Sequence, residues 1–353
     1  MKGPRIASTT CLWLRWTVGC AVFGWTLTHF VSAEVPERFP PPETLERFEY
    51  SRFKLGTRFR IVFYTGGGEL AAEAARQVFE RVDKLDQLLS DFRGDSELSR
   101  VNARAGNSAT RVSRELYEVL SASRRLSQRS GGVFDVTVGP VVKLWRRSFR
   151  SQTIPPAGEL EAARLLVGFE HLLLDPGPKT VLLRYQGMRL DLGGIAKGFI
   201  ADEVAALLRS RGIARLLIDA GGDITCGDPP PGLSGWTISL EACGKPVELL
   251  LANHSVASSG DLYRYVEVDG IRYSHIVDPR TGRGVRGPVA AAALAPTGMM
   301  ADAIATAAAI MDVDRIAGFL PDQDDYAVCV SRGIEPNLER VKTPGFDRFL
   351  QAP

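Results

Sequence analysis

The hydrophobic and polar positions of the chain follow two periodicities, and the helical one is the clearer. Apolar residues recur every three or four positions over 69–89, which predicts an amphipathic helix. A capping serine before a similar run predicts a second helix from Ser113 to the glycines at 131 and 132. Further helices are predicted at 159–166, from the glycine-rich turn at 191–198 to about Arg211, at 299–311, and from there through Leu320.

Strand patterns fill most of the remaining chain. β-branched and aromatic residues over 53–64 end in three glycines, which predicts one strand followed by a turn. Residues 90–106 are polar and loop-like. Because helices and strands come in mixed blocks, we expect an α+β fold with mixed or antiparallel sheets and packed helices, and not a doubly wound parallel sheet. Shorter strand-like runs lie at 171–174, 180–184, 216–218 and 326–330, and 236–295 is rich in strand patterns.

The first 33 residues have the pattern of a secretory signal. A positively charged start precedes an uncharged run over 16–33, which ends in Val31-Ser32-Ala33. We expect a signal peptide at 1–33 cleaved near Ala33, a Pro-rich linker at 34–49, and an exported, periplasmic protein without stable membrane insertion after cleavage. Two alternatives fit less well: an uncleaved anchor helix, since the run approaches spanning length, and a lipoprotein attached through Cys20.

Composition and charge narrow the class of protein. The chain has 353 residues, with 43 Lys and Arg against 41 Asp and Glu. The first 33 residues hold three basic and no acidic side chains, so the remainder is almost neutral. This balance argues against a protein that binds nucleic acid by neutralising phosphates. Apolar content of 45% and charged content of 24% are typical of globular proteins and exclude global disorder, collagen and coiled coil.

Three cysteines follow the signal: Cys226, Cys243 and Cys329. They form no C-x-x-C pair, which argues against a zinc or iron–sulfur site. Cys226 and Cys243 flank an expected turn and strand and would be able to pair in an oxidising compartment. Three separate buried thiols fit the sequence about as well.

Three segments carry candidate chemistry. The turn at 191–198 places two glycines before a helix start, where backbone N–H groups bind anions, with Lys197 in the first helical turn. His275 ends an expected strand beside a polar turn, which suits a general base. Asp302 and Thr306 are four residues apart on one helix face, a hard-oxygen pair suited to Mg²⁺. Taken singly, each also fits a structural role: a packed turn, a structural histidine, a helix-capping acid.

Read in order, these segments resemble the ApbE-type FAD:protein FMN transferases. The resemblance covers about residues 50–330 and rests on eight matching segments. They are LGT (55–57), SDF with DSELSRVN (90–102), GVFDVTVGP (132–140), DLGGIAKG (191–198), GGDI (221–224), SSGD (258–261), SHIVDPRTG (274–282) and ADAIAT (301–306). It implies an ApbE-like catalytic unit of two subdomains over 50–340, followed by a C-terminal tail at 341–353.

The resemblance also implies a site. Mg²⁺ would be held by the side chains of Asp302 and Thr306 and by a backbone oxygen of Gly194. His275 would be the catalytic base. Relatives usually carry Met where Leu55 stands and often Tyr or Trp where Phe92 stands; Phe92 keeps the ability to stack on a flavin ring but has no polar group. FAD contacts would fall on Leu55, Phe92, Val133, Phe134, Asp135, Asp191 and Lys197.

The implied reaction is Mg²⁺-dependent transfer of FMN from FAD, the substrate, to a Ser or Thr hydroxyl of an acceptor flavoprotein, with release of AMP. The acceptor would be an exported or membrane-bound flavoprotein, and nucleic acid is not an expected partner. Two alternatives use the same residues: a FAD pyrophosphatase that gives FMN and AMP, and a flavin-binding protein without turnover. Because a binding protein needs no base, His275 favours chemistry over storage.

Overall fold

An eight-stranded sheet runs through the part of the chain that the structure describes. The computed structural model describes residues 45–351 apart from 262–264, 322–323 and 335. Every neighbouring pair of strands in this sheet is antiparallel. In spatial order the strands are β1 (Glu46–Lys54), β2 (Thr57–Thr65), β6 (Leu216–Ala220), β7 (Ile224–Cys226), β10 (Ser255–Gly260), β14 (Val289–Ala295), β15 (Ala327–Arg332) and β16 (Glu339–Lys342).

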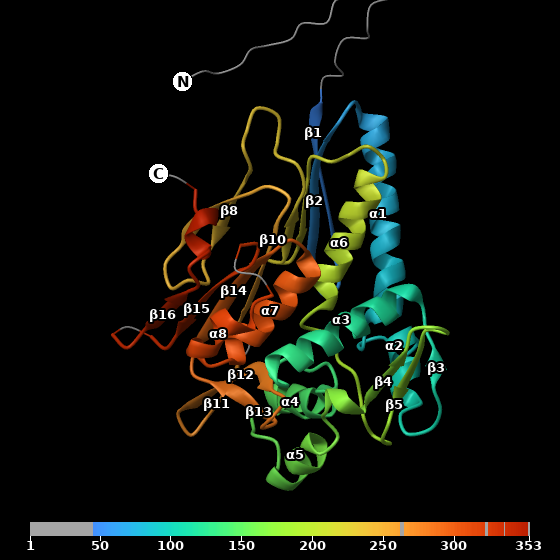
Figure 1. Ribbon diagram of the computed structural model, residues 1–353, viewed down its shortest axis with the longest axis vertical. Helices are drawn as coiled ribbons and strands as arrows, with labels where there is room; N and C mark the ends of the chain where they lie inside the picture. Colours follow the sequence, from blue (N-terminus) through green and yellow to red (C-terminus); the bar gives the residue numbers. More distant parts are fainter. Residues whose placement is uncertain (1–44, 262–264, 322–323, 335, 352–353) are drawn as a thin grey trace, which may run out of the picture. The chain divides into compact units, whose positions relative to one another are not determined.

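The two faces of this sheet are covered by different elements (Figure 1). Alternate residues of a strand point to opposite faces, so Ile61 of β2 packs under the helices while its neighbour Val62 packs on the other side. Three long helices cover the first face: α1 (Gly68–Leu89), α6 (Ala196–Arg209) and α7 (Gly298–Ile310). The second face is covered by the hairpin β8 (Trp236–Leu240) and β9 (Val247–Leu251) and by the 3₁₀ helix η2 (Phe346–Phe349).

Smaller elements pack around the ends of the helices. Two three-stranded sheets have the orders β3-β5-β4 and β11-β12-β13. Their strands are β3 (Thr110–Arg111), β4 (Leu172–Asp175), β5 (Thr180–Leu183), β11 (Tyr265–Val268), β12 (Ile271–Asp278) and β13 (Arg283–Arg286). The remaining helices are α2 (Glu97–Ala103), α3 (Arg114–Ser130), α4 (Gly139–Ser151), α5 (Ala157–Arg164), α8 (Val313–Phe319) and the 3₁₀ helix η1 (Phe169–His171).

Most elements expected from the sequence are present, and the α+β class is confirmed. Helix α3 begins after the side-chain cap of Ser113 and ends at Gly131 in the left-handed conformation, as its pattern predicts. The prediction of a single strand at 53–64 is wrong: a turn at Leu55 and Gly56, both with positive φ, separates two strands that pair as a hairpin. Residues 90–106, expected as loop, contain α2, whose N-terminus Ser96 caps.

Two boundaries also differ from expectation. Strand β1 begins at Glu46, so the end of the expected linker belongs to the sheet, while 34–44 and the signal at 1–33 lie outside the described residues. The expected tail at 341–353 contains the end of β16 and η2, and Phe346 is fully buried. The described residues from 45 to 351 belong to one compact unit, and their buried apolar side chains form three clusters. The expected division into two subdomains stays a prediction.

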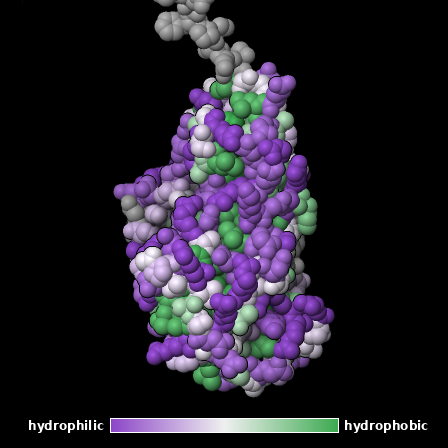
Figure 2. Space-filling view, turned by 90° about the vertical axis from the view of Figure 1, so that its right-hand side faces the viewer, coloured by the Kyte–Doolittle hydropathy of each residue, from purple (hydrophilic) through white to green (hydrophobic). Residues whose placement is uncertain are grey.

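Polar side chains dominate the face of the molecule that carries α1 (Figure 2). Apolar side chains appear there in small separate groups. No helix within the described residues has the length and apolar content needed to cross a membrane.

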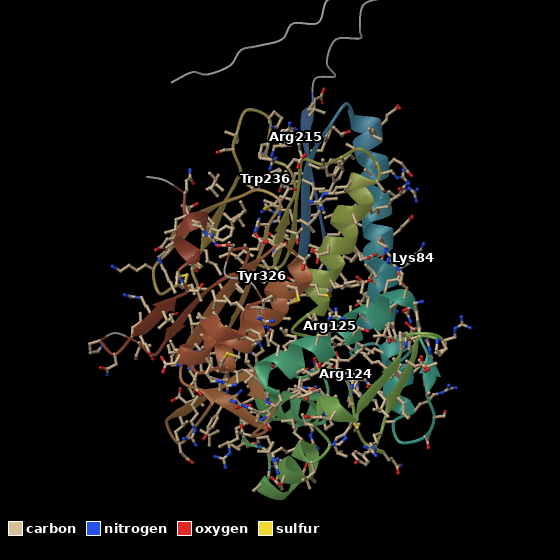
Figure 3. The ribbon with its side chains drawn as sticks, viewed as in Figure 1. Lys84, Arg124, Arg125, Arg215, Trp236 and Tyr326 are labelled. Atoms are coloured by element: carbon tan, nitrogen blue, oxygen red, sulfur yellow. A yellow bond between two sulfur atoms is a disulfide. The ribbon has the colours of Figure 1, made fainter. Side chains whose placement is uncertain are left out.

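The β8–β9 hairpin is fastened to the large sheet by Trp236 (Figure 3). Its indole Nε1 donates a hydrogen bond to the Asp228 carbonyl at 3.0 Å, and its ring lies 6.1 Å from that of Tyr64 on β2. A buried indole of this kind contributes both apolar area and a satisfied donor.

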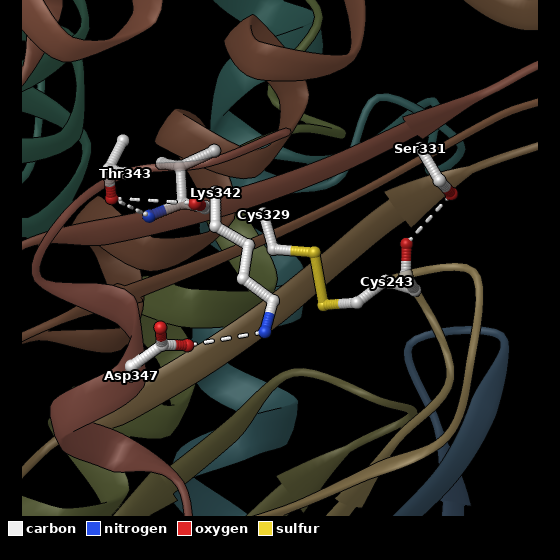
Figure 4. The surroundings of a disulfide bond; sticks show 8 residues. Cys243, Cys329, Ser331, Lys342, Thr343 and Asp347 are labelled. Atoms are coloured by element: carbon white, nitrogen blue, oxygen red, sulfur yellow. Dashed lines mark hydrogen bonds and ion pairs between the residues drawn. A yellow bond between two sulfur atoms is a disulfide. The ribbon is translucent and has the colours of Figure 1, made fainter. Parts of the chain in front are cut away.

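A disulfide joins Cys243, in the loop after β8, to Cys329 on β15 (Figure 4). The pairing of Cys226 with Cys243 is therefore wrong, and Cys226 is a buried free thiol. The link ties the hairpin layer to the strand beside β14. Beside it, the Ser331 hydroxyl donates to the Ala242 carbonyl at 3.0 Å, which fixes the same loop.

Helices α6 and α7 cross at two glycines. A Cβ added to Gly198 would lie 2.0 Å from the carbonyl oxygen of Gly298, closer than any side chain tolerates. The Asp202 carboxylate of α6 accepts from the backbone N–H groups of Gly298 and Met299 at 2.7 and 2.8 Å and so caps α7. Burial raises the pKa of Asp202 to about 6, although these hydrogen bonds oppose the rise.

Replacing Gly198 by Ala should destabilise the protein, because the new methyl group must push backbone away from backbone. Overpacking of this kind costs about 1–3 kcal/mol of unfolding free energy, measurable in urea. Gly318→Ala on α8 is the matched control, since a Cβ there meets open space; it should be neutral or slightly stabilising. Equal unfolding midpoints for the two variants would contradict the importance of the crossing.

The raised pKa of Asp202 predicts a pH effect on stability. Between about pH 4 and pH 6 the carboxyl ionises in the unfolded chain but stays protonated when folded, so its contribution to stability is lost as pH rises through this window. Asp202→Asn removes the titration. From pH 4 to 7 the stability difference between the two proteins should shift in favour of the variant, by up to about 3 kcal/mol. A constant difference across urea titrations at these pH values would refute the assignment.

Candidate functional site

The crossing of α6 and α7 brings the glycine-rich turn onto the face of α7 that carries Asp302. Asp302 is 5% exposed, and its Oδ2 accepts from the backbone N–H of Gly198 at 3.2 Å. Burial raises the pKa of this carboxyl to about 7, and the nearby charge of Asp223 adds to the rise. A buried carboxyl with this environment binds either a proton or a cation.

Thr306 lies one helical turn after Asp302 and contacts the turn as well. A Cβ on Gly194 would lie 2.8 Å from the Thr306 hydroxyl oxygen, so the two residues are in direct contact through the glycine backbone. The structure thus brings together the three residues expected to hold Mg²⁺: a carboxylate, a hydroxyl and a backbone segment. The donor set fits a hard cation that keeps waters or phosphate oxygens as its other ligands.

Lys197 completes this part of the site. It forms an ion pair with Asp223, whose side chain is 3% exposed and which follows two glycines between β6 and β7. The pair holds the ammonium group beside the first turn of α6, where the helix N-terminus adds partial positive charge. No group of three His, Cys, Asp or Glu side chains arranged for a metal occurs in the described residues; the expected set, with one carboxylate, is of a different kind.

Leu55 lies in the β1–β2 turn with a φ of 54°. Its neighbour Thr57 contacts the Gly221 loop, because a Cβ on Gly221 would lie 2.2 Å from the Thr57 hydroxyl. That loop leads to Asp223, the partner of Lys197. The structure therefore places Leu55 in the turn that borders the Lys197 region. Its partly buried side chain packs on the main core, the cluster of apolar side chains between the large sheet and helices α1, α6 and α7.

Asp191 anchors the other end of the glycine-rich turn. Its Oδ1 accepts from the N–H of Gly193 at 2.8 Å, and its Oδ2 pairs with Arg146 at 2.7 Å. The same guanidinium pairs with Asp91 and lies 4.2 Å from the ring centre of Phe92. Burial and the neighbouring Asp91 raise the pKa of Asp191, and Arg146 opposes the rise.

Phe92 is 79% exposed, so one large aromatic side chain stands open beside Asp191. Arg146 was not anticipated, because helix α4 was not recognised in the sequence. The alternation of apolar and basic positions along 139–151, with a proline at the helix start, was the available signal.

Val133 and Phe134 have fully or almost fully buried side chains in the main core. Because these values include the backbone, neither residue offers appreciable surface to a ligand in this structure, and their expected contact with FAD stays a prediction. Asp135 accepts from the backbone N–H and the hydroxyl of Thr137 at 2.8 and 2.7 Å, and burial raises its pKa to about 6. The segment is bound to the glycine-rich turn, since Asp191 N–H donates to the Val136 carbonyl at 2.8 Å.

His275 lies on β12, which packs against α7, and the next residue, Ile276, is part of the main core. Asp278 ends the strand and organises the following turn: its carboxylate accepts from the backbone N–H of Arg280 at 2.9 Å and pairs with the Arg280 guanidinium. The interactions of Asp278 are therefore those of a turn-forming residue. The histidine and the Asp302–Thr306 pair thus come from two elements in contact.

The comparisons with known proteins identify the family of this chain. Residues 55–330 match the sequence model of the ApbE family. A FAD:protein FMN transferase of Treponema pallidum is 34% identical over 294 residues, which cover 77% of this chain and 81% of that protein. Another, from Klebsiella pneumoniae, is 33% identical over 240 residues, covering 67% and 73%.

Solved structures give the same result for the fold. The ApbE protein of Thermotoga maritima superposes with a TM-score of 0.77 at 28% identity and covers 87% of this chain and all of that one. The flavin transferase ApbE of Vibrio cholerae gives 0.75 at 29% identity with the same coverage. The resemblance seen in the sequence is confirmed, and the chain belongs to the ApbE family.

Proposed function

We propose that this protein transfers FMN from FAD to a Ser or Thr hydroxyl of an acceptor flavoprotein, in a Mg²⁺-dependent reaction that releases AMP. The observation that carries the proposal is that the 191–198 turn contacts α7 at Asp302 and Thr306. The strand that carries His275 packs against the same helix. Relatives at 33–34% identity are FAD:protein FMN transferases.

Different residues of the site would hold the metal, the phosphates and the flavin ring. Asp302, Thr306 and the Gly194 backbone would hold Mg²⁺, which when bound neutralises charge on the phosphates. Lys197 and the N-terminus of α6 supply fixed positive potential for the same groups. Phe92 offers an exposed ring for the flavin, beside Arg146.

The reaction exchanges one P–O bond for another. The acceptor hydroxyl oxygen attacks the FMN-side phosphorus of FAD, and the bond from that phosphorus to the bridging oxygen breaks. AMP leaves with that oxygen and its negative charge. His275 takes the proton of the attacking hydroxyl. If water attacked instead, the products would be FMN and AMP, so the acceptor must be tested together with FAD.

We propose further that the chain acts outside the cytoplasm, on an exported or membrane-bound acceptor. The charge pattern of residues 1–33 and the disulfide between Cys243 and Cys329 support this location. Amino-terminal sequencing of exported protein should give a start near Glu34. A start at Met1 would contradict cleavage.

Replacing His275 by Ala should slow FMN transfer by about 10²–10⁴-fold, the usual effect of losing a general base, while FAD affinity changes little. The assay incubates protein, FAD, Mg²⁺ and an acceptor, and reads covalent flavin fluorescence on a denaturing gel. FAD affinity is measured by equilibrium dialysis, and added imidazole should restore part of the rate. A parallel loss of FAD affinity would mean that His275 binds FAD or supports the fold.

Asp302→Asn should abolish transfer by removing the charged oxygen that would bind Mg²⁺, with little change in side-chain volume. Asp202→Asn is its control, since that partly buried carboxylate lies at the same crossing but caps α7. The control should keep most of the activity. Activity in Asp302→Asn equal to the wild type would remove the proposed metal site.

A further inference from the structure

A cavity of about 590 Å³ lies where α5, the β12–β13 hairpin and the C-terminal end of α7 meet. Arginines from α5 and from the β12–β13 hairpin line it, and Ile310 of α7 is part of its wall. The lining residues that matter here are Arg164, Asp278, Arg280, Arg283, Arg286 and Ile310. Asp278 and Arg280 form the turn after the His275 strand, and none of these residues is a proposed catalytic, metal or FAD-binding residue.

The charge of this cavity is positive. Of its four arginines, Arg280 pairs with Asp278 and Arg164 pairs with Glu161, which leaves Arg283 and Arg286. Arg283 and Arg286 are exposed, and neither pairs with a carboxylate of the described residues. Guanidinium groups present two parallel donors that match a carboxylate. The cavity is therefore suited to anionic side chains.

The position of the cavity connects it with the chemistry. Strand β12 carries His275 and forms, with β13, the hairpin that lines the cavity. Ile310 follows Thr306 by one turn of α7. The hairpin is also held in place, because the Trp145 indole donates to the Gly282 carbonyl at 2.8 Å. A molecule bound here contacts the same hairpin that carries His275 and the same helix that carries Thr306.

We propose that this arginine cavity binds an acidic segment of the acceptor protein, next to the Ser or Thr that receives FMN. The inference rests on the proposed function. The phosphates of FAD have their own positive partners in Lys197 and the N-terminus of α6, at the opposite end of the α7 segment that carries Asp302 and Thr306. A second cluster of cations, on the hairpin that carries His275, matches the other substrate, and charge complementarity selects an acidic one.

The test uses the full chain and two fluorescein-labelled peptides of equal length, each with one central threonine. In one the threonine is followed by glutamates and in the other by glutamines. Fluorescence anisotropy at low salt should show the glutamate peptide binding at least about tenfold tighter, and the preference should shrink as salt rises.

Charge reversal locates the binding surface. Arg283→Glu with Arg286→Glu should abolish the preference for the glutamate peptide and leave FAD affinity unchanged. The matched control reverses two other exposed cations, Lys84 of α1 and Arg125 of α3 (Figure 3), which line no part of the cavity, and should keep the preference. Equal binding of both peptides, an unchanged preference in the Arg283 and Arg286 variant, or a matching loss of FAD affinity would overturn the proposal.

Flavin transfer to the peptides is read in the same samples. Covalent flavin on both peptides with equal efficiency would leave the proposed function standing and overturn the docking surface. A preference in binding that the variant abolishes, without flavin on either peptide, would support the surface and contradict the transfer reaction.

Discussion

The reciprocal attachment of α6 and α7 determines the geometry of the site. Asp202 of α6 accepts hydrogen bonds from the first turn of α7, and Asp302 of α7 accepts one from the first turn of α6. Glycines at 198 and 298 allow the two helices to approach closely enough for both contacts. Each helix thus supplies the anion that the other's N-terminus requires, and the glycine-rich turn is held in place as a consequence.

Several buried carboxyl groups around the site cost free energy when they ionise. Asp135, Asp202 and Asp302 all have pKa values raised by burial, to about 6, 6 and 7. In Asp135 and Asp202 the carboxylate is satisfied by donors within the fold. The pKa of Asp302 is raised further by repulsion from the charge of Asp223, and the positive charge of Lys197 opposes only part of this rise. A cation bound beside Asp302 would relieve this repulsion, which makes this carboxyl suited to hold metal.

The sequence predicted the parts of the site that are local in the chain. Segments such as 191–198 and 301–306 carry their own turn and helix signals, so their form and order were readable. Contacts between distant residues were not: Arg146 reaches Asp91 and Asp191 only after α4 has packed. The pairing of Cys243 with Cys329 also depends on which strands become neighbours, and the two arrangements that the sequence left open, a pair with Cys226 or three separate thiols, did not include it. The hairpin turn at Leu55 was hidden because a leucine with positive φ has no turn signature.

The disulfide gives part of the chain the topology of a closed ring. Cys243 and Cys329 are 86 residues apart, and His275, Asp302 and Thr306 all lie between them. In the oxidised unfolded chain these residues remain within one loop, which has less conformational entropy than an open chain. In the simple loop-closure treatment this loss raises the free energy of the unfolded state by about 4–5 kcal/mol at room temperature. Oxidation therefore favours the folded arrangement of the segment that holds the proposed base and the two side-chain metal ligands, whereas Leu55, Phe92, Asp191 and the Gly194 backbone lie outside the ring.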